Sequence, residues 1–591
     1  MKPSLPNLPT SLATIVALQI AASIPGLAES IDAVYFAQTH VQKASDSYFR
    51  LVGGRDALIK VHVVDPGTPS SPPVSATLDL DGDSLVIPLT GPATLPASIP
   101  DGPGVVQHSF SDSFTATIPA NWVQPGLEVT INVGSPVTTS TNINNLSVGA
   151  PTKVIMPMFD IGFFDPPYGD YPAGIFDELE AKWPVADLEV RRVPNITFPE
   201  VVIPPREGVP AAKVTSPEDY LNQTGIPFDG EQAATEKVTL ALRRAGGRAQ
   251  DQIYLFYANI YNVPAGGQAG GFLGVGNGTD GGVLHHELGH ALSLPHWGES
   301  TTNGYPYKGA QHGIAPPSDT LNGTHAGPTW AFDPPSQTFI PPTIQADNVG
   351  GWPAGTYNAD PMQGGGTGRQ QPGFLLNHFS DFSVNQMRNY LESNVLVWDE
   401  DEGTYGSWNQ ASADYSNYVS NNGVQYPLQH DVEVISVIAS ISGATPGVNM
   451  VYPPIGPYPG GYIILFDPTK AADRAEAVST GFVPAGGCDL SLRVTQGGVE
   501  KTFMLAASWD PGADPTSPSS LIAEGINLLA SDGPVTKADL LLTPDAQVNG
   551  LPANPQVLDT RIWNLVDPDP ATFAVAPIAA GPFAISMRAT T

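Results

Sequence analysis

The stretch HHELGHALSLPHW, residues 285–297, holds four of the 11 histidines in a chain of 591 residues. Apolar residues recur before and within it at helical spacing, so we expect a helix that ends shortly before Pro295, because proline cannot continue a helix. Residues four apart on a helix project from one face, which places His286 beside His290. The bend at the proline can return His296 to the same point.

Three imidazoles that meet at one point are a typical ligand set for a zinc ion that keeps an open coordination position. Glu287 can reach that position, where a carboxylate can take a proton from a zinc-activated water, which then attacks a carbonyl. The pattern predicts amide hydrolysis with His286, His290 and His296 as zinc ligands and Glu287 as general base. His285 lies about 100° around the helix from its neighbour, so we expect it to hydrogen-bond or to face solvent.

The composition favours a protein of several domains with many short strands. Gly and Pro each number 61, charged residues are 14% and hydrophobic residues 41% of the chain. A formal net charge of −32 makes nucleic acid and anionic membrane surfaces poor partners. Cys488 is the only cysteine, which excludes an intrachain disulfide and a cysteine-based zinc site. No run of about 18 apolar residues predicts a membrane span.

The first 28 residues have the pattern of a cleaved secretion signal. One lysine precedes an apolar run from Leu12 to Ile24, and Gly26-Leu27-Ala28 then fits a small-x-small cleavage site. We therefore expect an extracellular protein; an ordered leader is the alternative.

The rest of the chain divides into three parts with different patterns, which together predict a multidomain α+β protein. Residues 29–150 alternate between strand-like runs and turn clusters and predict a β-sandwich accessory domain. Residues 151–400 alternate strands with helices, at 173–183 and 231–246 among others, and predict an α/β domain with its site at one rim. Residues 401–591 predict a β-rich domain.

HELGHALSLPH resembles the metzincin consensus HExxHxxGxxH. The resemblance implies a metzincin-like zinc protease over residues 151–400, and the same three histidine ligands and general base. Ser293 stands where the consensus has a glycine in the left-handed conformation, which costs a serine about 1 kcal/mol or more. Metzincins also carry a methionine in a turn beneath the metal, and DPMQGGG supplies Met362. Downstream, we expect Ser383 to cap a helix.

A narrower resemblance is carried by VYFAQTHVQ, YFRLVGGRDALIKVHV, IPANWVQPGLEV, the HELGH helix and FSVNQMRNYLES. These stretches are similar to the StcE/dictomallein-type secreted metallopeptidases over residues 33 to 400. The resemblance implies protein substrates of the mucin-like, densely O-glycosylated kind. In these relatives a tyrosine often follows the third histidine; here Trp297 does, so other donors must hold the oxyanion if that tyrosine does so in the relatives.

The glycine-rich segment 268–278 is expected at a sheet edge, where an extended peptide can pair with free backbone groups. Glycines would leave room for bulky, sugar-bearing residues, and a glycine-rich connector is the alternative. The predicted substrate-binding residues are Gly271, Phe272, Leu273, Gly274 and Trp297.

Three other interpretations start from the same motif. GTYNAD resembles the aspzincin pattern GTxxD and would make Asp360 the third ligand, although its spacing is one residue too long. His312 could complete a structural zinc site as a fourth ligand. The third is a secreted glycan-binding or adhesion protein with a vestigial protease centre, against which the intact Glu287 argues. The sequence leaves open whether calcium also binds and which oligomer forms.

Overall fold

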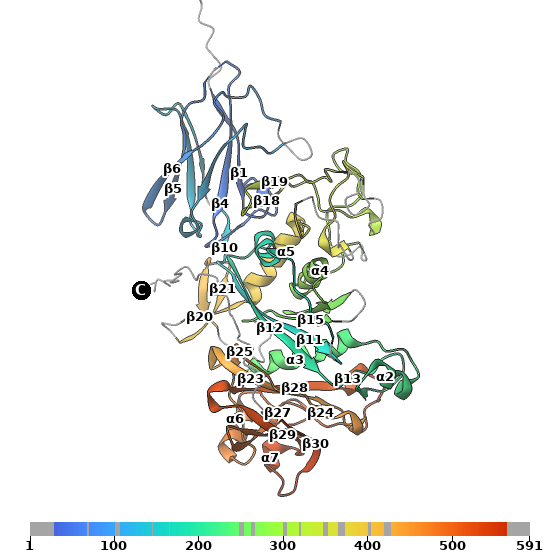
Figure 1. The fold of residues 1–591 in the computed structure, drawn as a ribbon. Helices are drawn as coiled ribbons and strands as arrows, with labels where there is room; N and C mark the ends of the chain where they lie inside the picture. The colour runs from blue at the N-terminus through green and yellow to red at the C-terminus, as the bar shows by residue number, and fades with distance from the viewer. Residues whose placement is uncertain are drawn as a thin grey trace, which may run out of the picture.

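The computed structural model describes residues 29–67, 70–100, 107–144, 146–164, 166–247, 253–261, 266–298, 304–317, 321–346, 353–363, 373–399, 403–418 and 427–563. The predicted secretion signal at residues 1–28 lies outside them. The N-terminal sheets lie at one end of the molecule, the parallel sheet and its helices in the middle, and the sheets of residues 429–563 at the other end (Figure 1). No helix in the described ranges is long and apolar enough to cross a membrane.

The N-terminal part is built from two antiparallel four-stranded sheets, ordered β2-β1-β4-β7 and β6-β5-β8-β9. Alternate side chains of both sheets are buried in one apolar cluster, as in a β-sandwich. The strands of this part are β1 (Ser30–Ala37), β2 (Val41–Gln42), β3 (Leu51–Val52), β4 (Ala57–Val64), β5 (Val74–Leu80), β6 (Asp83–Leu89), β7 (Phe114–Ile118), β8 (Glu128–Val133), β9 (Thr139–Ile143) and β10 (Val148–Gly149), with the 3₁₀ helix η1 (Ala120–Trp122).

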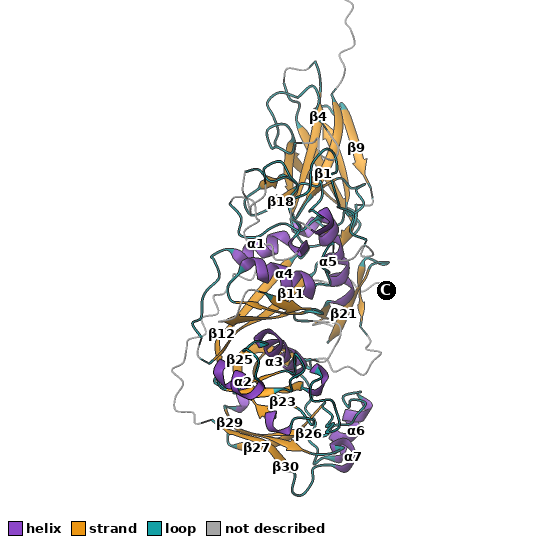
Figure 2. Cartoon of the chain, turned by 90° about the vertical axis from the view of Figure 1, so that its right-hand side faces the viewer, coloured by secondary structure: helices purple, strands orange, loops and turns teal. Residues whose placement is uncertain are grey.

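The central part contains a five-stranded sheet of order β12-β11-β15-β17-β16, parallel except for β16. Its strands are β11 (Lys153–Phe163), β12 (Asp187–Phe198), β15 (Phe256–Tyr261), β16 (Gly267–Ala269) and β17 (Leu273–Asn277). Apolar side chains alternate along β11 between two clusters, so both faces are covered. Helices α1 (Ile175–Lys182), α4 (Gly281–Ala291) and α5 (Asp381–Asn394) cover one face and α3 (Glu231–Gly246) the other (Figure 2).

Shorter elements complete the central part. They are β13 (Val201–Ile203), β14 (Ala212–Val214), α2 (Pro217–Thr224), η2 (Leu321–Gly323), β18 (Ala331–Asp333), β19 (Thr338–Ile340) and η3 (Pro361–Gln363). The hairpin β18–β19 packs against β1 and β4 of the N-terminal part through a separate apolar cluster.

The C-terminal part is mostly antiparallel sheet, and α3 packs between its strand β23 and the central sheet. Its strands are β20 (Leu396–Asp399), β21 (Thr404–Asn409), β22 (Asp414–Asn417), β23 (Gln429–Ile441), β24 (Met450–Val451), β25 (Ile455–Tyr462), β26 (Leu490–Gln496), β27 (Val499–Leu505), β28 (Ile522–Leu529), β29 (Val535–Leu542) and β30 (Gln556–Ile562). Its helices are α6 (Ala471–Ser479), α7 (Ala546–Asn549), η4 (Pro446–Val448), η5 (Pro518–Ser520) and η6 (Ala530–Asp532).

Two sequence expectations for the central part differ from the structure. Ser380, not Ser383, caps α5: its hydroxyl accepts the Ser383 N–H at 3.1 Å. Serine is a favoured N-cap residue at either position, and the tertiary contacts of this segment select Ser380. The glycine-rich run is not one edge strand but the hairpin β16–β17, of which only β16 lies at the edge.

Candidate metal centre

Helix α4 begins and ends with defined caps. The Asp280 carboxylate accepts the N–H groups of Gly282 and Val283 at 2.9 and 3.2 Å. At the other end Ser293 has φ 72°, the left-handed conformation that the resemblance implies for this position. The Leu294 N–H then donates to Gly289 O at 3.0 Å, which closes a Schellman turn. This turn directs the chain back along the helix.

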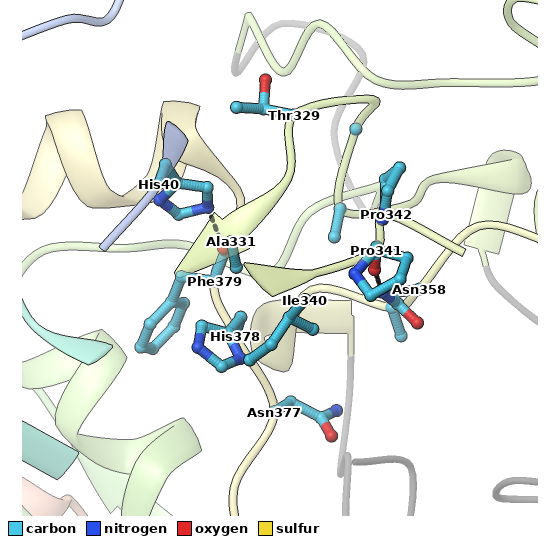
Figure 3. A pocket seen from close by; sticks show the side chains of 13 residues that line it. His40, Thr329, Ala331, Ile340, Pro341, Pro342, Asn358, Asn377, His378 and Phe379 are labelled. Atoms are coloured by element: carbon cyan, nitrogen blue, oxygen red, sulfur yellow. Dashed lines mark hydrogen bonds between the residues drawn. The ribbon is translucent and has the colours of Figure 1, made fainter. Parts of the chain in front are cut away.

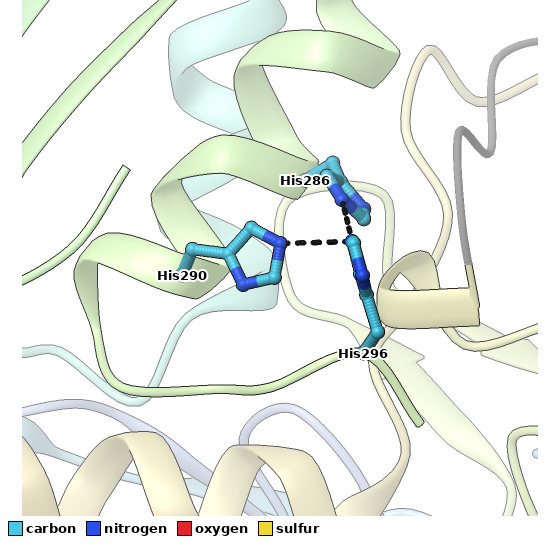
Figure 4. A group of neighbouring side chains, drawn as sticks. All are labelled: His286, His290 and His296. Carbon is cyan, nitrogen blue, oxygen red and sulfur yellow. Dashed lines mark hydrogen bonds between the residues drawn. The ribbon is translucent and has the colours of Figure 1, made fainter. Parts of the chain in front are cut away.

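The turn brings three imidazoles together. Nε2 of His296 lies 3.0 Å from Nε2 of His286 and 3.0 Å from Nε2 of His290, and all three ligand atoms lie within 4.8 Å of one another (Figure 4). Carbonyl oxygens accept at the other nitrogen of two rings: Pro361 O lies 2.8 Å from His286 Nδ1 and Leu294 O 2.7 Å from His290 Nδ1.

These contacts decide which nitrogens can bind a metal. A carbonyl only accepts, so Nδ1 of His286 and of His290 carries the proton, and Nε2 keeps its lone pair. Both lone pairs face Nε2 of His296, which can carry one proton at most, whereas a cation among the three nitrogens can bind all of them. Tetrahedral zinc with bonds of about 2.05 Å would space its nitrogens by about 3.3 Å, a change of a few tenths of an ångström. The donor set therefore fits a divalent cation.

Glu287 lies beside this cluster and is not one of its ligands. Its side chain is 6% exposed, and burial raises the pKa of Glu287 to about 7. The edge strand β16 covers it: a Cβ atom added to Gly267 would overlap the Glu287 side chain. The Glu287 side chain is thus packed under the edge strand, on the helix that also carries His286 and His290.

Met362 lies in η3 beneath the helix and is fully buried. A Cβ atom at Gly289 would overlap its sulfur, so the glycine allows this close approach. The Met362 carbonyl accepts the Trp297 N–H at 3.0 Å, and the preceding carbonyl, Pro361 O, is the one bound by His286. The turn that contains Met362 therefore supports two of the three histidines: His286 directly, and His296 through Trp297.

Comparisons with known proteins agree with this geometry. Residues 106–396 match the family described as Peptidase M66. The chain is 31% identical to dictomallein of Burkholderia pseudomallei and to dictomallein of Burkholderia mallei, in each case over 90% of this chain and 83% of the relative. It is 28% identical to dictomallein-2 of Dictyostelium discoideum, over 89% of this chain and 95% of that protein. The chain belongs to the peptidase M66 family. It is therefore a peptidase, and its three-histidine cluster is compatible with a metal site.

Trp297 of this M66 peptidase is buried. The indole is 3% exposed, stacks on Tyr305 with ring centroids 4.7 Å apart, and donates its N–H to Ser383 Oγ at 2.9 Å. The only side-chain donor of Trp297 is therefore already used inside the protein, and substrate binding by Trp297 stays a prediction.

The predicted substrate-binding residues of the glycine-rich run are mostly buried. Phe272, Leu273 and Gly274 are buried, and only Gly271, at the hairpin turn, is exposed. Among the described residues, the edge strand on this side of the sheet is β16, Gly267–Ala269. The signal in the sequence was weak, because GGQAGGFLGVGNG has no polar turn pair that marks a hairpin.

The rival ligands lie away from the cluster of the M66 peptidase. Asp360 is buried beneath it and accepts backbone and serine donors instead of contributing to the ligand group. His312 is exposed in a loop. His285 does not face solvent: it packs on Phe379 with centroids 4.4 Å apart, and burial lowers its pKa to about 3.

A separate, open hollow lies between the N-terminal sheet and the segment before α5. Figure 3 shows His40 from the N-terminal part bonded to Phe379 O, at 3.0 Å, with His378 and Asn358 on other walls. None of the three clustered histidines lines it. The hollow is thus distinct from the metal centre.

Proposed function

We propose that this M66 peptidase is a secreted zinc-dependent endopeptidase that acts on mucin-like, O-glycosylated proteins. The observation that carries the proposal is the convergence of three Nε2 atoms beside a buried glutamate. Bound zinc would supply Lewis acidity, lowering the pKa of a water molecule towards 7 and polarising the substrate carbonyl. A metzincin-like arrangement of the central part agrees with the HExxHxxxxxH spacing and the Met362 turn.

Glu287 acts as the general base in this proposal. Its pKa of about 7 suits a group that takes a proton from the attacking water and returns it to the leaving amine nitrogen. Burial beneath β16 shields the carboxyl group from bulk water, which supports this role.

The substrate would pair with the outer side of β16. Gly266 O and Gly270 N bond to β17, so the alternation of an antiparallel ladder turns the backbone groups of Gly267 and Ala269 outwards. In the described part of the chain no strand pairs with that side. A peptide added there runs past Glu287, and four glycines, at positions 266, 267, 270 and 271, leave space for glycosylated side chains.

Secretion belongs to the same proposal and is supported by the apolar run from Leu12 to Ile24 followed by a small-x-small site. It is tested by sequencing the N-terminus of the protein recovered from the medium of the producing cells. Cleavage after Ala28 is expected, and an intact leader on a cell-retained protein would contradict it.

The central test is metal content and cleavage of wild type beside Glu287→Gln. The variant is expected to keep one zinc per chain, since Glu287 is not a ligand, and to lose about 100-fold or more of its rate on a mucin-type glycoprotein. Glu218→Gln, on the exposed surface of α2, is the matched control. A variant that cleaves as fast as wild type would exclude Glu287 as the base. Equal cleavage of the enzymatically deglycosylated protein would exclude a requirement for glycans.

A further inference from the structure

Trp297 and Asp360 are joined by a buried hydrogen-bonded chain beneath the histidine cluster. The Trp297 indole N–H donates to Ser383 Oγ at 2.9 Å, and the Ser383 hydroxyl donates to Asp360 Oδ2 at 2.7 Å. Asp360 is 1% exposed and Ser383 is fully buried. A residue adjacent to His296 is thus connected to a carboxylate 63 residues further along the chain.

The same carboxylate joins two other segments. Oδ2 of Asp360 accepts the Ser380 N–H, at the N-cap of α5, at 2.8 Å, and Oδ1 accepts the Met362 N–H at 2.9 Å. In the described part of the chain no lysine or arginine forms an ion pair with Asp360. Burial raises the pKa of Asp360, while hydrogen bonds from Ser380, Ser383 and Met362 act in the opposite direction by favouring the charged form.

The positions of His286 and His296 depend on the segments that Asp360 joins. Trp297 follows His296 directly, and the backbone N–H of Trp297 donates to Met362 O at 3.0 Å. Pro361 O, between Asp360 and Met362, accepts from His286 Nδ1 at 2.8 Å. A shift of the Asp360 carboxylate would therefore move the carbonyl that orients one ring and the residue that anchors another.

We propose that Asp360 is the positioning residue of the metal centre. Through Met362 on one side and through Ser383 and Trp297 on the other, it sets the orientation of the rings of His286 and His296, and so the affinity of the cluster for its cation. The inference rests on the metal centre of the proposed function. It also gives Trp297 a role: the indole N–H is the donor that ties the third histidine to Asp360.

Metal affinity of purified Asp360→Asn, Ser383→Ala and Trp297→Phe, measured by competition with a chromophoric chelator, tests the proposal. Asp360→Asn replaces one acceptor oxygen with an NH₂ donor, which cannot bond to the N–H and O–H donors that face it. The variant is therefore expected to bind zinc about 10-fold to 100-fold more weakly. Ser383→Ala and Trp297→Phe each break the same link, so each is expected to weaken binding less, and the double variant no more than either alone. In the cobalt-substituted protein the visible absorption bands of Asp360→Asn should change, because they report ligand geometry.

The control is Asp539→Asn, which alters an equally buried carboxylate on β29, in the C-terminal sheet. It is expected to lower the melting temperature without changing zinc affinity. If Asp360→Asn, Ser383→Ala and Trp297→Phe behave like it, with reduced melting temperature and unchanged affinity and cobalt spectrum, Asp360 has no positioning role. Trp297→Phe removes a single hydrogen bond, and Ser383→Ala removes only the hydroxyl that joins Trp297 to Asp360 and Ser380, so both keep the test decisive if Asp360→Asn fails to fold. Wild type that binds no zinc would instead overturn the proposed function.

Discussion

At the scale of single residues, close packing beneath the histidines limits what the sequence can contain. Gly289 faces the Met362 sulfur, and Ser293 accepts a left-handed conformation that serine rarely adopts. Both positions are set by the need to bring a helix, a returning loop and a distant turn to one point.

Gly289→Ala is expected to lower the free energy of unfolding by about 1–3 kcal/mol, because the new methyl group overlaps Met362. An alanine in a helix would otherwise stabilise by about 1 kcal/mol relative to glycine. Urea denaturation of the metal-free protein measures the change. Combining it with Met362→Ala should recover part of the loss. If Gly289→Ala alone is more stable than wild type, Gly289 and Met362 do not pack against each other closely enough to exclude a methyl group.

His290→Ala is expected to abolish stabilisation by zinc. A cation that binds the folded state alone raises its stability by about 2.7 kcal/mol at a concentration 100 times its dissociation constant. The melting temperature of wild type should therefore rise with added zinc and fall with a chelator, and that of the variant should respond to neither. His312→Ala, in an exposed loop, is the control and should respond like wild type. A variant that still gains stability would exclude His290 as a ligand.

At the scale of elements, the hairpin β16–β17 is held to α4 by Phe272. This buried residue has φ 61°, its N–H donates to Ala291 O at 2.9 Å, and its ring stacks on Tyr390 of α5. A strained residue with such contacts fixes the distance between the sheet edge and the helix that carries Glu287. Sequence periodicity found α3 and α4 because their patterns are long; it missed the hairpin because each strand is short and rich in glycine.

Ala269→Pro is expected to raise KM by up to about 10-fold with little change in kcat, since it removes one outward N–H worth about 0.5–1.5 kcal/mol as a substrate hydrogen bond. An edge strand tolerates proline where the N–H faces solvent, so zinc content should be unchanged. Ala269→Ser keeps the N–H and should keep the KM of wild type. Steady-state kinetics on a peptide substrate give both values, and an unchanged KM for the proline variant would exclude strand pairing at this edge.

At the scale of the whole molecule, the N-terminal sheets are fixed to the helices of the central part. The Arg55 guanidinium donates to the carbonyls of Ala181, Trp183 and Val185, at and just beyond the C-terminal end of α1, at 2.9, 2.5 and 2.9 Å. Arg50 pairs with Glu392 of α5 at 2.7 Å. The accessory sheets therefore support the two helices that pack behind the metal centre.

Arg55→Met is expected to lower the free energy of unfolding by about 2–3 kcal/mol, because three helix-end carbonyls lose a charged donor. Thermal unfolding with and without zinc measures the effect, and the zinc-induced rise in melting temperature should be preserved. Arg474→Met, in α6 of the C-terminal part, is the comparison and should leave the junction intact. An unchanged stability of Arg55→Met would mean that the two parts do not depend on this contact.

The sequence alone determined the local chemistry: a helix that carries His286, Glu287 and His290, and a proline bend that returns His296. These features depend on residues at most ten apart, whose geometry follows from helix pitch and backbone sterics. Tertiary structure decided what surrounds them, including the free edge at β16, the burial of Trp297 and the place of Asp360. Those features depend on contacts between residues as far apart as Trp297 and Ser383, 86 positions along the chain, and such contacts arise only when separate elements pack together.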